Sequence, residues 1–174
     1  TTPYFGQISV RYLKKVDILV IVDTHVHAGL NKYEPVEVLI FQMEQNDITH
    51  SVLIQYMGNT DNRYLLECLE RFPGKFSAVG IVDTGKYDAD NVLEHWFNKG
   101  VNGIRLGPKA RSPGRDPLCI WRKAEQLEMT VSSIGSSEDF GSDQFRGLVE
   151  KVPDLKIVIE HLGGVSRDVE PPYS

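Results

Sequence analysis

The stretch Val20-Ile21-Val22-Asp23-Thr24-His25-Val26-His27-Ala28-Gly29 joins a run of β-branched residues to two histidines one residue apart. Alternate side chains of a strand point to the same side, so His25 and His27 are expected to place two imidazoles in one space. Neutral imidazole is a common ligand of zinc and related ions. Because five apolar residues, Ile18–Val22, precede the histidines, the stretch predicts a buried strand that ends in half of a metal site, rather than two unrelated loop histidines.

Five further short apolar runs follow, and with the first they make a regular series of predicted strands. The six runs are Ile18–Val22, Ser51–Ile54, Ser77–Val82, Val101–Leu106, Thr130–Ser133 and Lys156–Ile159. Most are continuous rather than alternating, which is typical of parallel strands covered on both faces. Their spacing suits one strand, one helix and two short loops.

The segments between these runs have helical periodicity. In one of them, Leu65, Leu69 and Phe72 share a helical face, and Pro73-Gly74 follow as a stop signal. This succession predicts a single α/β domain over residues 1–174, with residues 1–15 as an N-terminal arm. Two architectures fit the pattern: an open, doubly wound sheet, or part of an eight-stranded β/α barrel.

Composition narrows the classes of function. The 174 residues are 41% hydrophobic and 25% charged, as in ordinary globular proteins, and the formal net charge of −5 with no basic cluster argues against nucleic acid as a partner. No signal peptide or membrane-spanning run is evident, so we expect a cytoplasmic protein that does not bind membranes. The two cysteines, Cys68 and Cys119, are expected to be small buried hydrophobes in a reducing compartment. The sequence leaves open whether the protein forms a homo-oligomer.

Polar side chains follow nearly every predicted strand. In both candidate architectures, functional groups lie just beyond the carboxyl ends of the strands. Gln55 and Ser133 are therefore candidate substrate contacts, and His161 is a third histidine at such an end. Arg105 and Lys109 are candidates for holding a substrate carboxylate, or else ordinary partners of the many acidic residues. No glycine-rich nucleotide-binding motif follows the first strand.

Three segments in this order resemble the amidohydrolase-related (amidohydrolase 2) family, in its branch of barrel-type metal-dependent hydrolases that includes lactonases and decarboxylases. They are Val22–His27, Gly100–Leu106 and Pro153–Gly164. Asp61–Tyr64 and Arg71–Phe76 match the same branch. The resemblance runs from about residue 16 to the end of the chain, and these motifs are fairly specific for the superfamily but weak for any one substrate.

The resemblance implies a (β/α)8 barrel, of which about six strands are present here. It also implies that His25 and His27 bind a divalent metal, zinc before manganese, and that His161 binds the metal or the substrate carbonyl. A water made nucleophilic by the metal would then attack that carbonyl. Asp23 would orient a histidine from outside the ligand set.

The sequence departs from the family pattern at two places. Val131–Gly135 has no histidine where many relatives carry one after the fifth strand, which keeps metal-independent action open. The aspartate that usually follows strand eight is also missing, since the sequence stops soon after the sixth predicted strand. Residues 1–174 alone are therefore expected to be inactive and to associate through the apolar edges of the first and sixth strands.

The leading hypothesis is a hydrolase that acts on a small carboxylated substrate such as a lactone, with His25, His27 and His161 as catalytic and metal-binding residues. Arg105, Lys109, Gln55 and Ser133 would contact the substrate. One alternative is a metal-dependent decarboxylase of the same fold. The other is a catalytically incomplete barrel with a structural or partner-binding role.

Overall fold

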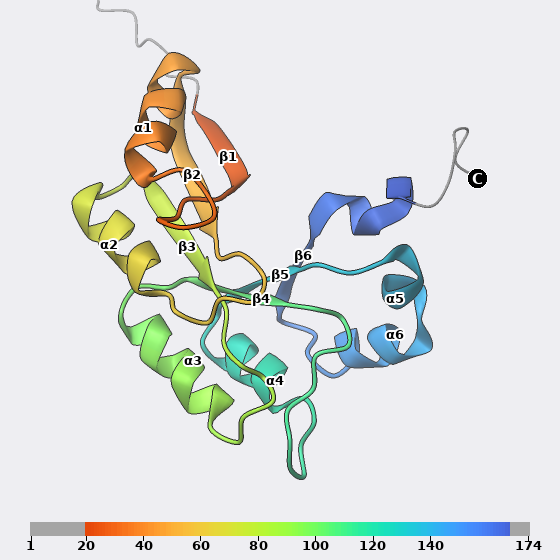
Figure 1. Ribbon diagram of the computed structural model, residues 1–174. Helices are drawn as coiled ribbons and strands as arrows, with labels where there is room; N and C mark the ends of the chain where they lie inside the picture. Colours follow the sequence, from red (N-terminus) through yellow and green to blue (C-terminus); the bar gives the residue numbers. More distant parts are fainter. Residues whose placement is uncertain (1–19, 168–174) are drawn as a thin grey trace, which may run out of the picture.

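A computed structural model describes residues 20–167, which form one curved, parallel sheet with helices on its outer side (Figure 1). The six strands are hydrogen-bonded in sequence order, β1-β2-β3-β4-β5-β6. Their bounds are β1 Ile21–Val26, β2 Ile48–Ile54, β3 Phe76–Gly80, β4 Gly103–Leu106, β5 Thr130–Ser133 and β6 Lys156–Ile159. Sequence order around a curved parallel sheet is the arrangement of a β/α barrel, and it excludes the doubly wound alternative, whose strand order reverses.

Helices connect successive strands and cover the outer face of the sheet (Figure 1). They are α1 Val36–Gln45, α2 Arg63–Arg71, α3 Ala89–Asn98, α4 Cys119–Gln126, α5 Ser137–Gly141 and α6 Asp143–Val149, followed by the 3₁₀ segment η1 Glu160–Arg167. The prediction of an incomplete (β/α)8 barrel with about six strands is thus confirmed. The predicted arm, residues 1–15, and the first two residues of the predicted first strand lie outside the described part of the chain. Within residues 20–167, no helix is long and apolar enough to cross a membrane.

The apolar core lies between the outer face of the sheet and the helices. One cluster joins α3, α4 and α6 to β4 and β5 around the fully buried Trp121, whose indole Nε1 donates to the carbonyl of Ala110 at 2.9 Å. A second cluster joins α1 and α2 to β2 and β3 around Leu53 and Leu65. These clusters fix the sheet and therefore the positions of the strand ends.

Strand β1 contains a β-bulge between Asp23 and Val26, which includes His25 and precedes His27. Asp23 pairs with Ser51 and Val26 pairs with Leu53, so three steps along β1 match two steps along β2. The extra residue breaks the alternation of side chains: Thr24 lines the open interior of the sheet, and the next residue, His25, also faces inward, while Val26 packs on the outer core. Bulges often re-aim side chains at functional sites, and this one turns both histidines into the interior.

Atoms of β3 and β5 approach Gly103 of β4 closely on the inner side of the sheet. An added Cβ there would lie 2.8 Å from the carbonyl oxygen of Thr130 and 2.9 Å from Cγ2 of Val79, closer than real Cβ contacts. Glycine at this position lets β3, β4 and β5 curve tightly past one another.

We therefore expect Gly103→Ala to reduce the free energy of unfolding by about 1–3 kcal/mol, because the neighbouring strands must separate to admit the methyl group. Urea denaturation monitored by circular dichroism measures the change. Gly147→Ala is the matched control, since no atom lies within 4 Å of its added Cβ, and it is expected to stabilise α6 by about 0.5–1 kcal/mol. Equal midpoints for Gly103→Ala and the wild type would contradict the crowding argument.

Candidate functional site

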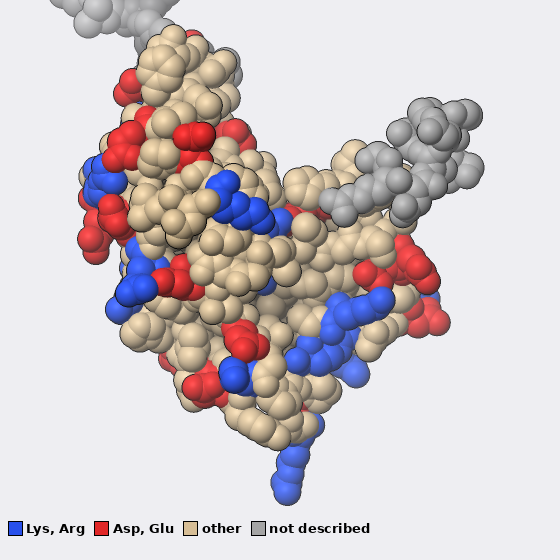
Figure 2. All heavy atoms as spheres, in the orientation of Figure 1, with Lys and Arg blue, Asp and Glu red and all other residues tan. Residues whose placement is uncertain are grey.

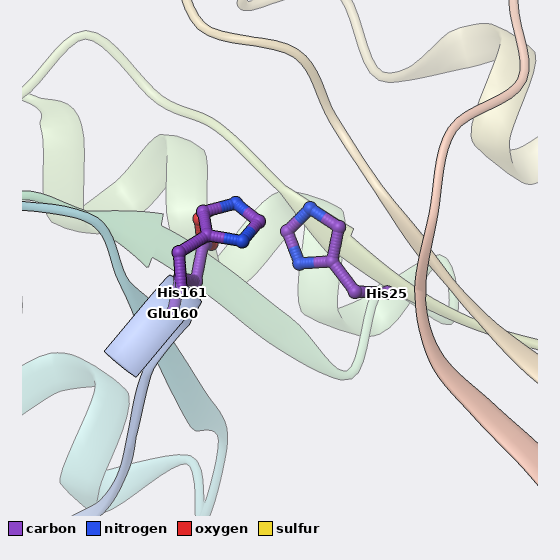
Figure 3. Close-up of side chains that lie close together, drawn as sticks. All are labelled: His25, Glu160 and His161. Carbon is purple, nitrogen blue, oxygen red and sulfur yellow. The ribbon is translucent and has the colours of Figure 1, made fainter. Parts of the chain in front are cut away.

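Three imidazoles converge inside the curve of the sheet, where β1 and β6 end. The rings of His25 and His27 have centroids 5.0 Å apart, and those of His25 and His161 are 4.8 Å apart. Figure 3 shows His25 reaching from β1 toward His161 and Glu160, which follow directly after β6. The space-filling view shows a hollow between the α1–β2 region and the β6 region (Figure 2). The structure thus brings the three histidines that were predicted from the sequence into one place.

The ring of His27 is held in one orientation by two contacts. Its Nδ1 lies 2.6 Å from the carbonyl oxygen of Ile54. A carbonyl only accepts, so Nδ1 carries the proton and Nε2 presents a lone pair. The ring of Tyr33 stacks on the imidazole with centroids 4.5 Å apart and an interplanar angle of 19°. The tautomer and direction of His27 are therefore fixed before any ligand binds.

The electrostatics of the site keep His25 and His27 neutral. Burial is the largest cause that lowers the pKa of His25, against the raising effect of Glu160. Burial also lowers the pKa of His27, although its bond to Ile54 opposes this. Both rings are therefore unprotonated at neutral pH, as metal ligands and general bases must be.

The donor geometry fits a divalent metal ion, which the resemblance implies. His25 Nε2 and His27 Nε2 lie 3.3 Å apart. Two nitrogen ligands of one tetrahedral zinc lie about 3.4 Å apart when each bond is about 2.0–2.1 Å. One ligand atom each from His25, Glu160 and His161 also lies within 4.8 Å of the others. His25 would therefore hold an ion either together with His27 or together with Glu160 and His161, since His27 does not belong to the second group.

His161 stands on an unusual backbone turn at the start of η1. Residues 161–164 all have positive φ, between 52° and 74°, in the left-handed region. Glycines at positions 163 and 164 adopt this conformation easily, whereas His161 and Leu162 do so only at an energetic cost. The turn leaves the side chain of His161 52% exposed, with Nε2 3.8 Å from Oε2 of Glu160. Strained backbone of this kind is commonly found at functional sites.

A buried ion pair crosses the interior directly behind the histidines. Arg105 on β4 donates from Nε to Oε1 of Glu160 at 2.9 Å and from a terminal nitrogen to Oε2 at 2.5 Å, and the two side chains are only 5% and 1% exposed. Ser132 on β5 also donates to Oε1, at 2.7 Å. Burial raises the pKa of Glu160, but the bonds from Arg105 and Ser132 more than offset it and hold the pKa below its ordinary value. Glu160 is therefore an anion fixed in place.

The other residues predicted to contact substrate are placed differently from the histidines. Each nitrogen of the Arg105 guanidinium donates a hydrogen bond, two of them to Glu160 and one to the carbonyl of Gln55. The Gln55 side chain itself is buried and bonded to Asp61 and Tyr56, so it holds the loop after β2. Lys109 is exposed and paired with Asp139 at 2.5 Å. None of these three side chains presents an unpaired polar group toward the histidines.

Ser133 and Asp23 also take other positions. Ser133 is fully buried, with no hydrogen-bond partner for its hydroxyl, and it has the same strand parity as Val131, which packs in the helix-side core. Asp23 lies before the bulge, and its carboxylate accepts from the backbone N–H of His25 at 3.1 Å rather than from an imidazole. It therefore supports the bulge and does not orient a ring.

Sequence reasoning missed the roles of Glu160 and Tyr33. The alternation of side chains along a strand could have identified Glu160. In the sheet, Arg105 pairs with Ser132 and Ser132 pairs with Val158. Glu160 comes two residues after Val158, so its side chain lies on the same inner face. The contact of Tyr33 with His27 could not be predicted, because the loop after β1 has no periodic pattern that would give the direction of its side chains.

The chain matches the model of a family described as "Amidohydrolase" over residues 22–173. No curated protein matches it significantly. Solved structures with the same fold include a probable 2-pyrone-4,6-dicarboxylic acid hydrolase from Acinetobacter baumannii with citric acid bound (TM-score 0.65, 21% identity, 83% of this chain and 59% of that one). A putative enzyme of the same name from Pseudomonas putida has TM-score 0.65 and 24% identity over 83% and 58% of the two chains. An amidohydrolase from Burkholderia multivorans with bound HEPES has TM-score 0.64 and 13% identity, over 83% and 58%. The chain thus spans somewhat less than three fifths of the length of these structures.

Proposed function

Because this chain belongs to the amidohydrolase family, we propose that it is a hydrolase that opens a small carboxylated lactone by adding water to the ring carbonyl. The observation that supports this most directly is the pair of His25 and His27 Nε2 atoms, 3.3 Å apart at the carboxyl end of the sheet. Likeness to the two solved structures named as 2-pyrone-4,6-dicarboxylic acid hydrolases supports the choice of a lactone.

In this proposal each residue of the site has a separate role in the hydrolysis. The oxygen of water bonds to the carbonyl carbon, the ring C–O bond breaks, and the leaving oxygen gains the proton that water gives up. With no ion bound, the unprotonated Nε2 of His27, directed by Ile54, accepts a proton from the water, whereas an ion bound to that nitrogen would replace this role by acidifying the water. His161 lies across from His25 and orients the carbonyl oxygen. A bound divalent ion would polarise the carbonyl and acidify the water.

Glu160 sets the charge of the site without taking part in proton transfer. Its Oε1 accepts from both Arg105 and Ser132, and its Oε2 accepts from Arg105. A carboxylate oxygen offers about two lone-pair sites, so Oε2 keeps one acceptor position, toward His161. The anion therefore favours a positively charged metal ion beside it, where the carbonyl would be activated.

A substrate panel tests the proposal. The protein at its full natural length is freed of metal by a chelator, supplied with zinc, manganese or neither, and mixed with 2-pyrone-4,6-dicarboxylate, unsubstituted 2-pyrone and γ-butyrolactone. We expect ring opening of the dicarboxylate, followed as loss of the ring's ultraviolet absorbance, and a faster rate with a metal that binds. Absence of ring opening for every lactone under all three metal conditions would contradict the proposal, and release of carbon dioxide instead would favour the decarboxylase.

A further inference from the structure

A lysine ammonium group is held between two tyrosine rings in the loop that follows β1. Nζ of Lys32 lies 5.7 Å from the ring centroid of Tyr33 and 5.0 Å from that of Tyr56, and the two rings are 5.8 Å apart. Contact with aromatic faces attracts a cation and limits its positions. Although Lys32 is exposed, its charge is therefore localised over the loops that follow β1 and β2.

The same aromatic group reaches the candidate site. Tyr33 stacks on His27 with its ring centroid 4.5 Å from that of the imidazole, so the ring that contacts the Lys32 ammonium also contacts the histidine. Burial is the main cause that lowers the pKa of His27, and the positive charges of Arg105 and Lys32 act in the same direction. The field of Lys32 thus extends to the imidazole that lines the site.

Lys32 is also available for a ligand, unlike the cations predicted from the sequence. Arg105 is bound by Glu160, and Lys109 is bound by Asp139. Within residues 20–167, no carboxylate oxygen lies within 4.0 Å of Lys32 Nζ. Next to the neighbouring Asn31 and to Tyr56 lies an open cavity of about 150 Å³ between the loops after β1 and β2, whose lining includes Asp61, itself paired with Arg63. An anion at this position would gain a charge-assisted hydrogen bond without displacing an internal partner.

We propose that Lys32 binds a carboxylate of the substrate, about one aromatic ring away from the carbonyl that is attacked, and that it thereby selects carboxylated lactones over neutral ones. Tyr33 and Tyr56 position the ammonium, and Lys32 acts on binding rather than on the chemical step. The kinetic part of this inference rests on the hydrolase activity proposed above, whereas the binding of a carboxylate does not.

The kinetic test compares Lys32→Ala, Lys32→Arg and Lys99→Ala on 2-pyrone-4,6-dicarboxylate and unsubstituted 2-pyrone. Lys99 is the matched control, because its Nζ lies 5.8 Å from the ring centroid of Trp96, also over an aromatic face, but on α3. For Lys32→Ala we expect KM for the dicarboxylate to rise about tenfold or more with kcat within about twofold, and no change for 2-pyrone. Lys32→Arg should restore most of the affinity, and Lys99→Ala should match the wild type.

A binding test separates this inference from the proposed reaction. Citrate is titrated calorimetrically into the wild type and the same three variants, without any turnover. If the substrate panel shows hydrolysis, the KM values test the role of Lys32, and an unchanged KM for the dicarboxylate in Lys32→Ala overturns the inference. If the panel shows no hydrolysis, the hydrolase proposal fails and citrate binding tests the role of Lys32. Citrate binding that weakens about tenfold in Lys32→Ala, and in no other variant, supports the inference. Absence of citrate binding, or binding that does not depend on Lys32, overturns it.

Discussion

Replacing His27 with alanine is expected to lower kcat/KM for lactone hydrolysis by about 10²–10⁴-fold, the usual contribution of a positioned acid or base. The change removes the only nitrogen of the ring that faces His25, at 3.3 Å, and the bond that holds it to Ile54. Initial rates over a range of substrate concentrations measure the loss. Thermal melting followed by circular dichroism verifies that the variant is folded.

His95→Ala is the matched control for this prediction. His95 lies in the last turn of α3 with its ring against Trp96, at 5.3 Å between centroids, on the outer side of the sheet. Its variant should keep the wild-type rate. If His27→Ala retains kcat/KM within about threefold of the wild type while folded, His27 has no part in the reaction.

The second large effect concerns the ion pair between Arg105 and Glu160. Glu160→Gln keeps the size of the side chain but leaves a guanidinium that is 5% exposed without its counter-ion. Breaking a buried pair from one side costs about 3–5 kcal/mol, so we expect the free energy of unfolding to fall by that amount. Urea denaturation at pH 7 measures it.

A double variant and the pH dependence distinguish this explanation from general damage to the core. Arg105→Met with Glu160→Leu removes both charges, and it should be more stable than Glu160→Gln alone. Because the folded pKa of Glu160 is below its ordinary value of 4.5, its stabilising effect is present above about pH 4.5 and is lost as the pH falls through the folded pKa. The difference between the wild type and Glu160→Gln should therefore shrink in acid. A double variant no more stable than the single one would refute the uncompensated-charge argument.

The fold was largely predictable because its signals are local and repeated. Apolar runs such as Val101–Leu106 and stop signals such as Pro73-Gly74 come from residues close in sequence, and they located β4 and the end of α2 within a few residues. The convergence of His25 and His161 followed from one rule, that parallel strands deliver their ends to one edge of a sheet.

The partners of the polar groups were not predictable in the same way. Arg105 was a candidate either for holding a substrate carboxylate or for pairing with an acidic residue of the chain, and nothing in the sequence identified Glu160, 55 positions away, as that partner. A charged side chain inside a sheet pairs with the counter-ion that the strand register brings to it, and the register is set by the hydrophobic pattern of the whole strands and by their connections rather than by the charged residue. The left-handed turn at His161 gives only a weak signal, the glycines that follow it.

The extra residue in β1 decides which way each of the following side chains points. Because of it, Val26 packs on the helix-side core, while His25 and His27 on either side of it contact each other inside the sheet. One short segment thus serves the core and the site at once. Loss of Thr24 would keep every histidine in the chain, yet it would shift the direction of the side chains on one side of the deletion. Whether relatives share this site therefore depends on the number of residues in the strand as much as on their identity.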